Sequence, residues 1–308
     1  MPHDIRASAP AADAIAIGVM AYNEEANIGH LLESLVRQSV DSRITSIVVM
    51  ASGCTDRTCD IAAEWARRDP RVRLVAETKR SGKVFAINAF IKLVREPLCI
   101  ITSADVSFNP TTVERITRPF EDPQIGVVGA HAVPVNTPDS FVGFTVNLMW
   151  SLHHDLALVT PKMGEMCAFR NVIDGLDPNT LYDEMSVLYE IEKRGYRAAY
   201  APDALIENCG PGNLSDFIKQ RTRWIVANLS LERDYRMYVA TMKPSAVLHA
   251  TLAYVRQDWR RIHWFAAAAC VEAWARLRAR FEYSALRRHR KFHVWDRIPT
   301  TKQVVRTK

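Results

Sequence analysis

The stretch "LCIITSAD", residues 98–105, is a run of apolar and hydroxyl side chains that ends on one carboxylate, Asp105. Such a short apolar run is typical of a buried strand. Three similar runs precede it, at 14–20, 44–50 and 72–77, and helical patterns separate all four. This β-α-β-α-β-α-β alternation predicts an α/β fold with a mostly parallel sheet that is flanked by helices.

The pattern is less regular after this stretch. Residues 125–135, "IGVVGAHAVPV", resemble a strand pair interrupted by Pro134. A helix is expected over 183–195, where a terminal glycine is a usual stop, and a short strand is expected over 196–202. Apolar residues at helical spacing predict a further helix over 214–229.

Composition excludes several classes of protein. With 48% hydrophobic and 24% charged residues in 308, the chain can build a full core. The longest stretch without a charged side chain, 140–154, has 15 residues, whereas a membrane span needs about 20. Asp4 and Asp13 argue against a signal peptide. Six cysteines without a CxxC pair are expected to be reduced, which favours a cytoplasmic protein.

Positive charge is concentrated near the end of the chain. Residues 255–308 hold 14 Lys and Arg against 4 Asp and Glu, a charge of +10, so that the total of +6 leaves −4 for the rest. We expect a catalytic domain over 1–235 and a basic helical extension over 236–308. An Ala-rich helix, 262–281, and the basic run 287–291 lie in this extension.

Three roles for the extension stay open. A basic helix with tryptophans suits peripheral contact with an anionic membrane surface. Alternatively, the helix packs on the catalytic domain or on a second copy in a homodimer. Nucleic acid is not an expected partner, because no nucleic-acid-binding motif accompanies the charge.

Polar segments follow the predicted strands at the edge where ligands of such sheets bind. In order along the chain, the segments of interest are AYNEE (21–25), SGCTDRT (52–58), RSGKVFAIN (80–88), SADV (103–106), GEMCAFRN (164–171), YDE (182–184) and QRTRW (220–224). Their succession over about residues 14–230 resembles the family 2 glycosyltransferases, which are inverting enzymes with a Rossmann-like GT-A fold. QRTRW is the most specific element, similar to the QxxRW motif of the synthase branch, whose transmembrane helices are not expected here.

The resemblance implies a metal-assisted site. Sugar transfer from a nucleoside diphosphate needs the charge of the leaving diphosphate to be neutralised, which Mg²⁺ or Mn²⁺ can do. The family's DxD metal motif is Ser103-Ala104-Asp105 here, which implies Asp105 as the metal ligand and Ser103 as a hydrogen-bonding partner of the donor. One carboxylate can suffice, because Mg²⁺ often takes only one or two from the protein.

The reaction also needs a base that removes a proton from the acceptor hydroxyl. Asp183 and Glu184 occupy the place of the family's TED motif, and we favour Glu184 while both remain candidates. The resemblance assigns Gln220, Arg223 and Trp224 to the acceptor or the diphosphate, for which a guanidinium and a flat ring are suited.

The remaining family positions imply a binding site for the nucleotide-sugar donor. The positions expected to contact the donor are Ala21, Tyr22, Glu24, Ser52, Lys83 and Gly164. The family commonly has an acid that binds uracil after the second strand, but Ala51 and Ser52 stand there. UDP is still the favoured nucleotide, with GDP and dTDP as alternatives.

Together these features predict an inverting glycosyltransferase, a hexosyl- or related sugar transferase in the cytoplasm or at the membrane surface. Its acceptor is a carbohydrate, a lipid-linked molecule or a small molecule. The alternatives are a nucleotide-sugar-binding protein without activity and a nucleotidyltransferase. A nucleotidyltransferase is disfavoured because "AYNEEANIG" after the first strand is not a Gly-rich phosphate loop.

Overall fold

The computed structural model describes residues 11–286 and 298–301. The strands are β1 (Ile15–Ala21), β2 (Ile44–Ser52), β3 (Val72–Glu77), β4 (Leu98–Ser103), β5 (Val106–Phe108), β6 (Ile125–Pro134), β7 (Met166–Arg170) and β8 (Arg197–Asn208). The helices are α1 (Ile28–Val36), α2 (Thr58–Arg68), α3 (Lys83–Leu93), α4 (Thr112–Thr117), α5 (Phe141–Val159), α6 (Asp183–Glu192), α7 (Leu214–Tyr235), α8 (Pro244–Gln257) and α9 (Ile262–Leu286). The predicted alternation of four strands and three helices from β1 to β4 is confirmed.

The strands form one eight-stranded sheet in the order β3-β2-β1-β4-β7-β6-β8-β5. β1, β2, β3 and β4 pair in parallel, so their carboxyl ends meet at one edge of the sheet. β7 runs antiparallel to β4 and pairs Met166 with Thr102. Because β7 begins where β4 ends, the segment just before Met166 reaches the same edge.

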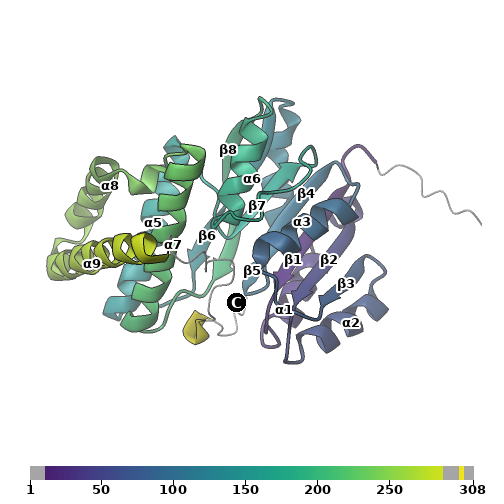
Figure 1. The fold of residues 1–308 in the computed structure, drawn as a ribbon, viewed down its shortest axis with the longest axis horizontal. Coiled ribbons are helices and arrows are strands. Elements are labelled where there is room, and N and C mark those ends of the chain that lie inside the picture. Colours follow the sequence, from purple (N-terminus) through teal and green to yellow (C-terminus); the bar gives the residue numbers. More distant parts are fainter. Residues whose placement is uncertain (1–10, 287–297, 302–308) are drawn as a thin grey trace, which may run out of the picture.

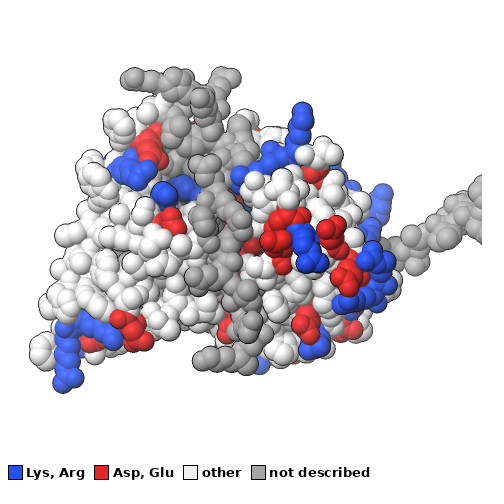
Figure 2. Space-filling model, turned by 90° about the horizontal axis from the view of Figure 1, so that it is seen from below, with Lys and Arg blue, Asp and Glu red and all other residues white. Residues whose placement is uncertain are grey.

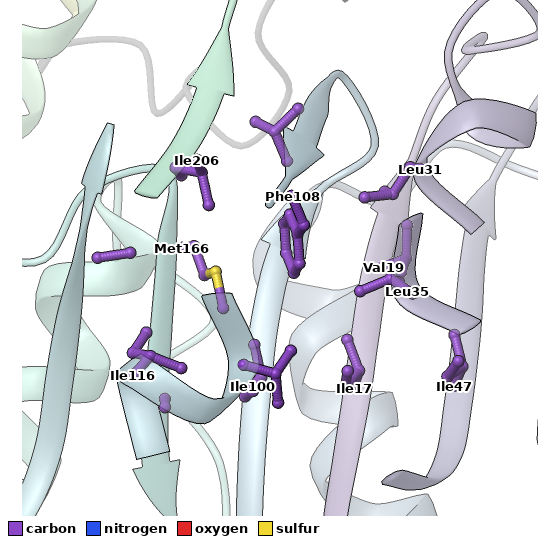
Figure 3. Packing of buried hydrophobic residues seen from close by; sticks show 14 of the residues in the cluster. Ile17, Val19, Leu31, Leu35, Ile47, Ile100, Phe108, Ile116, Met166 and Ile206 are labelled. Carbon is purple, nitrogen blue, oxygen red and sulfur yellow. The ribbon is translucent and has the colours of Figure 1, made fainter. Parts of the chain in front are cut away.

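Alternating side chains of the sheet fill two separate cores. Ile17 and Val19 of β1 point toward α1, α2 and α4, where they meet Leu31 and Leu35 (Figure 3). Ala16 and Met20, which alternate with these residues along β1, pack with α3 and α6 on the other face of the sheet. Both faces are covered, so β1 is buried along its whole length and its sequence is a nearly continuous apolar run.

Helices α5, α7, α8 and α9 form the other end of the molecule (Figure 1). α9 packs on α7 through Ala275 and Ala279, which meet Ile225 and Val226 in a small apolar core. At least this part of the extension therefore packs on the same chain. α7 ends at Tyr235, and the division into two domains there stays a prediction. The basic run 287–291 lies outside the described residues.

Several elements differ from the sequence-based expectation. The segment 125–135 forms one strand, β6, with Pro134 as its last residue, where the missing N–H does little harm. The expected short strand at 196–202 extends to Asn208 as β8. β5, α4, α5 and β7 were not expected at all, and α8 was not expected as a separate helix. In the part of the chain that the structure describes, no helix has the length and apolarity that crossing a bilayer requires.

Candidate active site

A cavity of about 830 Å³ opens at the carboxyl edge of the parallel strands and extends among the helices. Every residue that the sequence analysis proposed for the site contributes to its wall. These are Ala21, Tyr22, Glu24, Ser52, Lys83, Ser103, Asp105, Gly164, Asp183, Glu184, Gln220, Arg223 and Trp224. The structure thus brings together residues that lie as far apart in the sequence as Ala21 and Trp224.

The strand ends place the polar groups of the sheet side. Ser52 ends β2, Tyr22 follows β1 and Asp105 lies just beyond β4. Gly53 has φ +65°, and a Cβ there would lie 2.5 Å from the backbone nitrogen of Arg80. Only glycine fits this close approach of two loops, which fixes the position of Ser52.

Two residues of this region were missed by the sequence analysis. Glu77, at the end of β3, accepts a hydrogen bond from the hydroxyl of Ser52 at 2.7 Å. Ser52 in turn accepts one from the backbone N–H of Ser81 at 3.1 Å. The guanidinium of Arg80 lies 3.8 Å from the ring centroid of Tyr22, and both residues line the cavity. The sequence shows Arg80 within "KRSGK", close to Lys83, but its cation–π contact with Tyr22 depends on the geometry of the loop.

The acid pair at the start of α6 is bound by a lysine. Lys83, the first residue of α3, lies 3.0 Å from Oδ2 of Asp183 and also donates a hydrogen bond to Oε1 of Glu184. Glu184 is 6% exposed, whereas Lys83 is only half-buried, so the pair lies in the cavity wall with the lysine on its open side. The sequence analysis expected Lys83 at the donor, but here its ammonium bridges the two candidate bases.

The two carboxyls have opposite pKa shifts. Burial, and then the neighbouring charge of Asp183, raise the pKa of Glu184 to about 8, against the opposing effect of Lys83. Burial also disfavours the ionised form of Asp183, but Lys83 and the hydrogen bonds hold its pKa below the usual value. Near neutral pH, Glu184 therefore holds a proton that Asp183 lacks. A group whose pKa lies near the working pH is suited to general acid–base catalysis.

The tryptophan of QRTRW is surrounded by polar partners. The indole N–H of Trp224 donates to the hydroxyl of Tyr182 at 2.9 Å. Lys162 Nζ lies 4.1 Å from the ring centroid, and the guanidinium carbon of Arg221 lies 4.2 Å from it. The ring of Trp224 therefore already makes cation–π contacts with two basic side chains in the cavity wall. The sequence analysis assigned no role to either cation.

Arg221 joins the motif to the C-terminal helix. Its Nε and Nη2 donate to the carboxylate of Glu272 on α9 at 2.6 and 2.9 Å. Arg276, one turn further along α9, donates to the same carboxylate at 2.7 Å. Burial opposes ionisation of Glu272, but the two arginines lower its pKa to about 2. The extension is thus tied to the most specific motif of the chain.

We expect Glu272→Gln to lower the free energy of unfolding by about 1–3 kcal/mol, because it leaves two arginines without a carboxylate. The contribution of Glu272 is complete above its ordinary pKa of 4.5 and is lost as the pH falls toward 2. Chemical denaturation at neutral pH measures the loss.

Glu282→Gln is the matched control for this prediction. Glu282 accepts from Arg278 on the exposed side of the same helix, and we expect its loss to cost less than about 0.5 kcal/mol. Equal losses for the two variants would contradict a special role for the Arg221–Glu272 pair.

Asp105 is the carboxylate at which a divalent cation would bind. Among the described residues, no three His, Cys, Asp or Glu side chains cluster in a way that would bind a metal. Asp105 lines the cavity next to Ser103, so it offers a carboxylate and a hydroxyl but no complete coordination shell. These residues fit a Mg²⁺ or Mn²⁺ ion that takes its other oxygens from a diphosphate and water.

Comparison with known proteins places these features in context. Residues 10–227 match the family model described as "Glycosyltransferase like family 2". An N-acetylglucosaminyltransferase of Rhizobium meliloti (strain 1021) is 22% identical over 237 residues, which are 70% of this chain and 55% of that protein. The uncharacterized glycosyltransferase EpsJ of Bacillus subtilis (strain 168) is 30% identical over 115 residues, 37% of this chain and 33% of that protein. The chain therefore spans about a third to about half of the length of these relatives.

A solved structure has the same fold. The mannosyltransferase PcManGT from Pyrobaculum calidifontis, in complex with GDP-Man and Mn²⁺, superimposes with a TM-score of 0.59 and 23% sequence identity. The match covers 89% of this chain and 75% of that one. The α/β sheet with its flanking helices is thus a GT-A fold, as the sequence predicted.

Proposed function

The chain belongs to glycosyltransferase family 2, and on that premise we propose that it is an inverting enzyme that transfers a sugar from a nucleotide-sugar donor to an acceptor hydroxyl. One observation carries the proposal. A single cavity gathers the buried acid pair, Asp105 after β4 and the QRTRW motif of α7, which come from separate parts of the chain. Two adjacent carboxyls in the cavity wall, one of them with a raised pKa, are suited to proton transfer, which the binding of a nucleotide sugar alone does not require.

In this proposal Glu184 acts as the base. The acceptor oxygen attacks the anomeric carbon of the donor sugar, its proton passes to the Glu184 carboxylate, and the bond between that carbon and the diphosphate breaks. Asp183 and Lys83 hold Glu184 in place through their mutual contacts. Arg223 supplies a fixed positive charge in the cavity wall. A divalent cation held by Asp105 would neutralise charge on the diphosphate.

We assign the nucleotide to the strand ends β1 and β2. The Tyr22–Arg80 pair offers a flat cationic surface on which a base can stack, and Ser52 offers a hydroxyl oxygen already oriented by Glu77. No charged group at Ala51 or Ser52 selects uracil, but UDP remains the first choice, before GDP and dTDP.

Two measurements test this function. Release of nucleoside diphosphate from UDP-, GDP- and dTDP-sugars is followed with Mg²⁺ or Mn²⁺ and with EDTA, and we expect release that EDTA abolishes. Calorimetric titration with UDP, GDP and dTDP in the presence of the same metal ions identifies the nucleotide base that the site prefers. Binding of nucleotide sugars without turnover in a broad acceptor screen would support the non-catalytic alternative, and no binding of UDP at millimolar concentration would overturn the choice of UDP.

We further propose that α9 contacts the cytoplasmic membrane surface. Trp274, Leu277 and Phe281 recur at helical spacing and are 56%, 62% and 75% exposed. Figure 2 shows broad uncharged surface over the helical end of the molecule, interrupted by small groups of charged side chains. An exposed apolar stripe on a basic extension suits an interface with anionic lipid.

Flotation with phosphatidylglycerol vesicles tests the membrane contact. We expect the full chain to float and the double variant Trp274→Ser/Phe281→Ser to float several-fold less, because it removes two large side chains of the stripe. Phe85→Ser/Leu93→Ser is the matched control, since these exposed side chains lie on α3. Equal flotation of all three proteins would end the membrane proposal.

A further inference from the structure

The cavity that holds the acid pair extends into a chamber among helices α5, α8 and α9. Its wall there is apolar, and it includes Leu148, Leu152, Leu156, Val247, Phe265 and Ala268. Sugar hydroxyls would find few hydrogen-bonding partners on such a wall, and burying them there would be unfavourable. The chamber therefore suits the apolar part of a ligand.

A group of three basic residues, the cationic cluster, lines the same cavity: Lys162, Arg221 and Arg276. Arg221 belongs to the QRTRW motif, and Arg276 comes from α9, the helix that also supplies Phe265 to the apolar wall. Lys162 donates to the hydroxyl of Thr241 at 3.1 Å. The cluster thus connects the catalytic motif with the apolar chamber.

Basic side chains outnumber their carboxylate partners in the cationic cluster. Glu272 is shared by Arg221 and Arg276, and no carboxylate among the described residues pairs with Lys162. Lys162 is only 4% exposed, and burial, together with the charge of Arg221, lowers its pKa well below the usual value. A buried ammonium without a counter-ion is unfavourable, which is the reason for this lowered pKa. A bound anion would relieve that cost.

A second buried polar group faces this region without a partner. His153 of α5 is 7% exposed, and its Nε2 has no hydrogen-bonding partner among the described residues. A Cβ on Gly164 would lie 3.5 Å from this nitrogen, so the imidazole borders the segment that lines the cavity before β7. It offers one more polar contact for a ligand's head group.

We propose that the chamber and the cationic cluster form an acceptor site for a phosphate-bearing lipid. The apolar chain occupies the chamber, the phosphate lies on Lys162, Arg221 and Arg276, and a hydroxyl of the same head group reaches the acid pair. The role of this lipid as a sugar acceptor rests on the proposed function, whereas its binding to the site does not. The donor diphosphate is assigned elsewhere, to Asp105 and the strand ends.

Farnesyl phosphate is a minimal probe, because it joins an apolar chain to a phosphate. Titration of the full chain, followed by calorimetry, compares it with farnesol and with inorganic phosphate. We expect farnesyl phosphate to bind at least about tenfold more tightly than either, since charge-assisted hydrogen bonds add to the burial of the chain. Equal affinities for farnesyl phosphate and farnesol would overturn the proposal.

Variants of the cationic cluster test its role. Lys162→Met and Arg276→Gln should each weaken the binding of farnesyl phosphate about tenfold and leave the affinity for farnesol unchanged. Lys219→Met and Arg278→Gln are matched controls on α7 and α9, because both side chains lie outside the cavity wall. Lys162→Met should also leave the melting temperature unchanged or raise it, since it removes an uncompensated buried amine. Unchanged binding of farnesyl phosphate by both cluster variants would overturn the assignment.

A third variant tests the chamber. Ala268→Phe places a large side chain at a buried position of the cavity wall, so both farnesyl ligands should bind more weakly, whereas Ala267→Phe, at an exposed position of α9 outside the wall, should not affect them. Equal effects would contradict the assignment of the chamber.

Titration with nucleoside diphosphate separates the acceptor site from the donor site. If UDP or GDP competes with farnesyl phosphate, and Lys162→Met weakens the binding of the nucleotide and of the lipid equally, the cationic cluster belongs to the donor site and the proposal is wrong. If the lipid binds as expected but no nucleotide sugar is turned over, the proposed function fails while the lipid site stands.

Discussion

Glu184→Gln should lower kcat by about 10²–10⁴-fold, the range that a positioned general base contributes. The amide keeps the size of the side chain but cannot accept the proton of the acceptor hydroxyl. Because Lys83 still has Asp183 as a partner, we expect the nucleotide affinity to change little. Initial rates at saturating donor, together with calorimetry, separate the loss in kcat from any loss in binding.

The pH dependence of the wild type gives an independent test of the base. Glu184 must be ionised to accept a proton, and its pKa in the free protein is raised to about 8 by burial and by Asp183. We therefore expect kcat/KM to rise about tenfold per pH unit below this value and to level off above it. If Asp183 is the base, its lowered pKa leaves kcat/KM flat across the neutral range.

Glu192→Gln is the matched control, because Glu192 lies on the same helix but is exposed at its far end. It should behave as the wild type. Retention of more than about a tenth of the wild-type rate by both Glu184→Gln and Asp183→Asn would exclude the acid pair as the source of the base.

Asp105→Asn is expected to cost about 10²–10³ in kcat, since it removes the one predicted metal carboxylate at the site of the leaving charge. The substitution is nearly isosteric, so the cavity should keep its shape. We also expect the dependence of UDP affinity on Mn²⁺ to fall or vanish, which calorimetry with and without the metal measures directly.

Asp203→Asn provides the corresponding control, because this exposed carboxylate of β8 pairs with Arg115 and does not line the cavity. Metal-dependent nucleotide binding that survives in Asp105→Asn would show that the metal is held elsewhere. A wild type that EDTA does not affect would remove the metal from the proposed function altogether.

The first half of the fold could be predicted because its strands are buried on both faces. β1 and β2 are then nearly continuous apolar runs that contrast sharply with the amphipathic helices between them. α5 has no such contrast. It carries apolar residues on several sides, because it meets both the sheet and the cavity, so no polar stripe marks it as a helix. β7, with five residues, is too short for a clear pattern.

The candidate site also has one part that could be predicted from the sequence and one part that could not. Tyr22, Ser52 and Asp105 could be placed together from one rule, that parallel strands end at a common edge. Lys162 could not, since its hydrogen-bonding partner, Thr241, lies 79 residues away in the sequence. The pairing of Arg221 with Glu272 spans 51 residues between two helices, and nothing local in either helix distinguishes these residues from ordinary surface charges.

α9 connects the outside of the molecule with the QRTRW motif. Glu272, which binds Arg221, and the exposed Trp274 are two positions apart on one rigid helix, so their side chains point in nearly opposite directions. A surface that bound the outer stripe would therefore contact the same helix that supplies the carboxylate partner of Arg221. Because α9 also lines the cavity, any displacement of this helix by a contact at the surface would displace that part of the cavity wall as well.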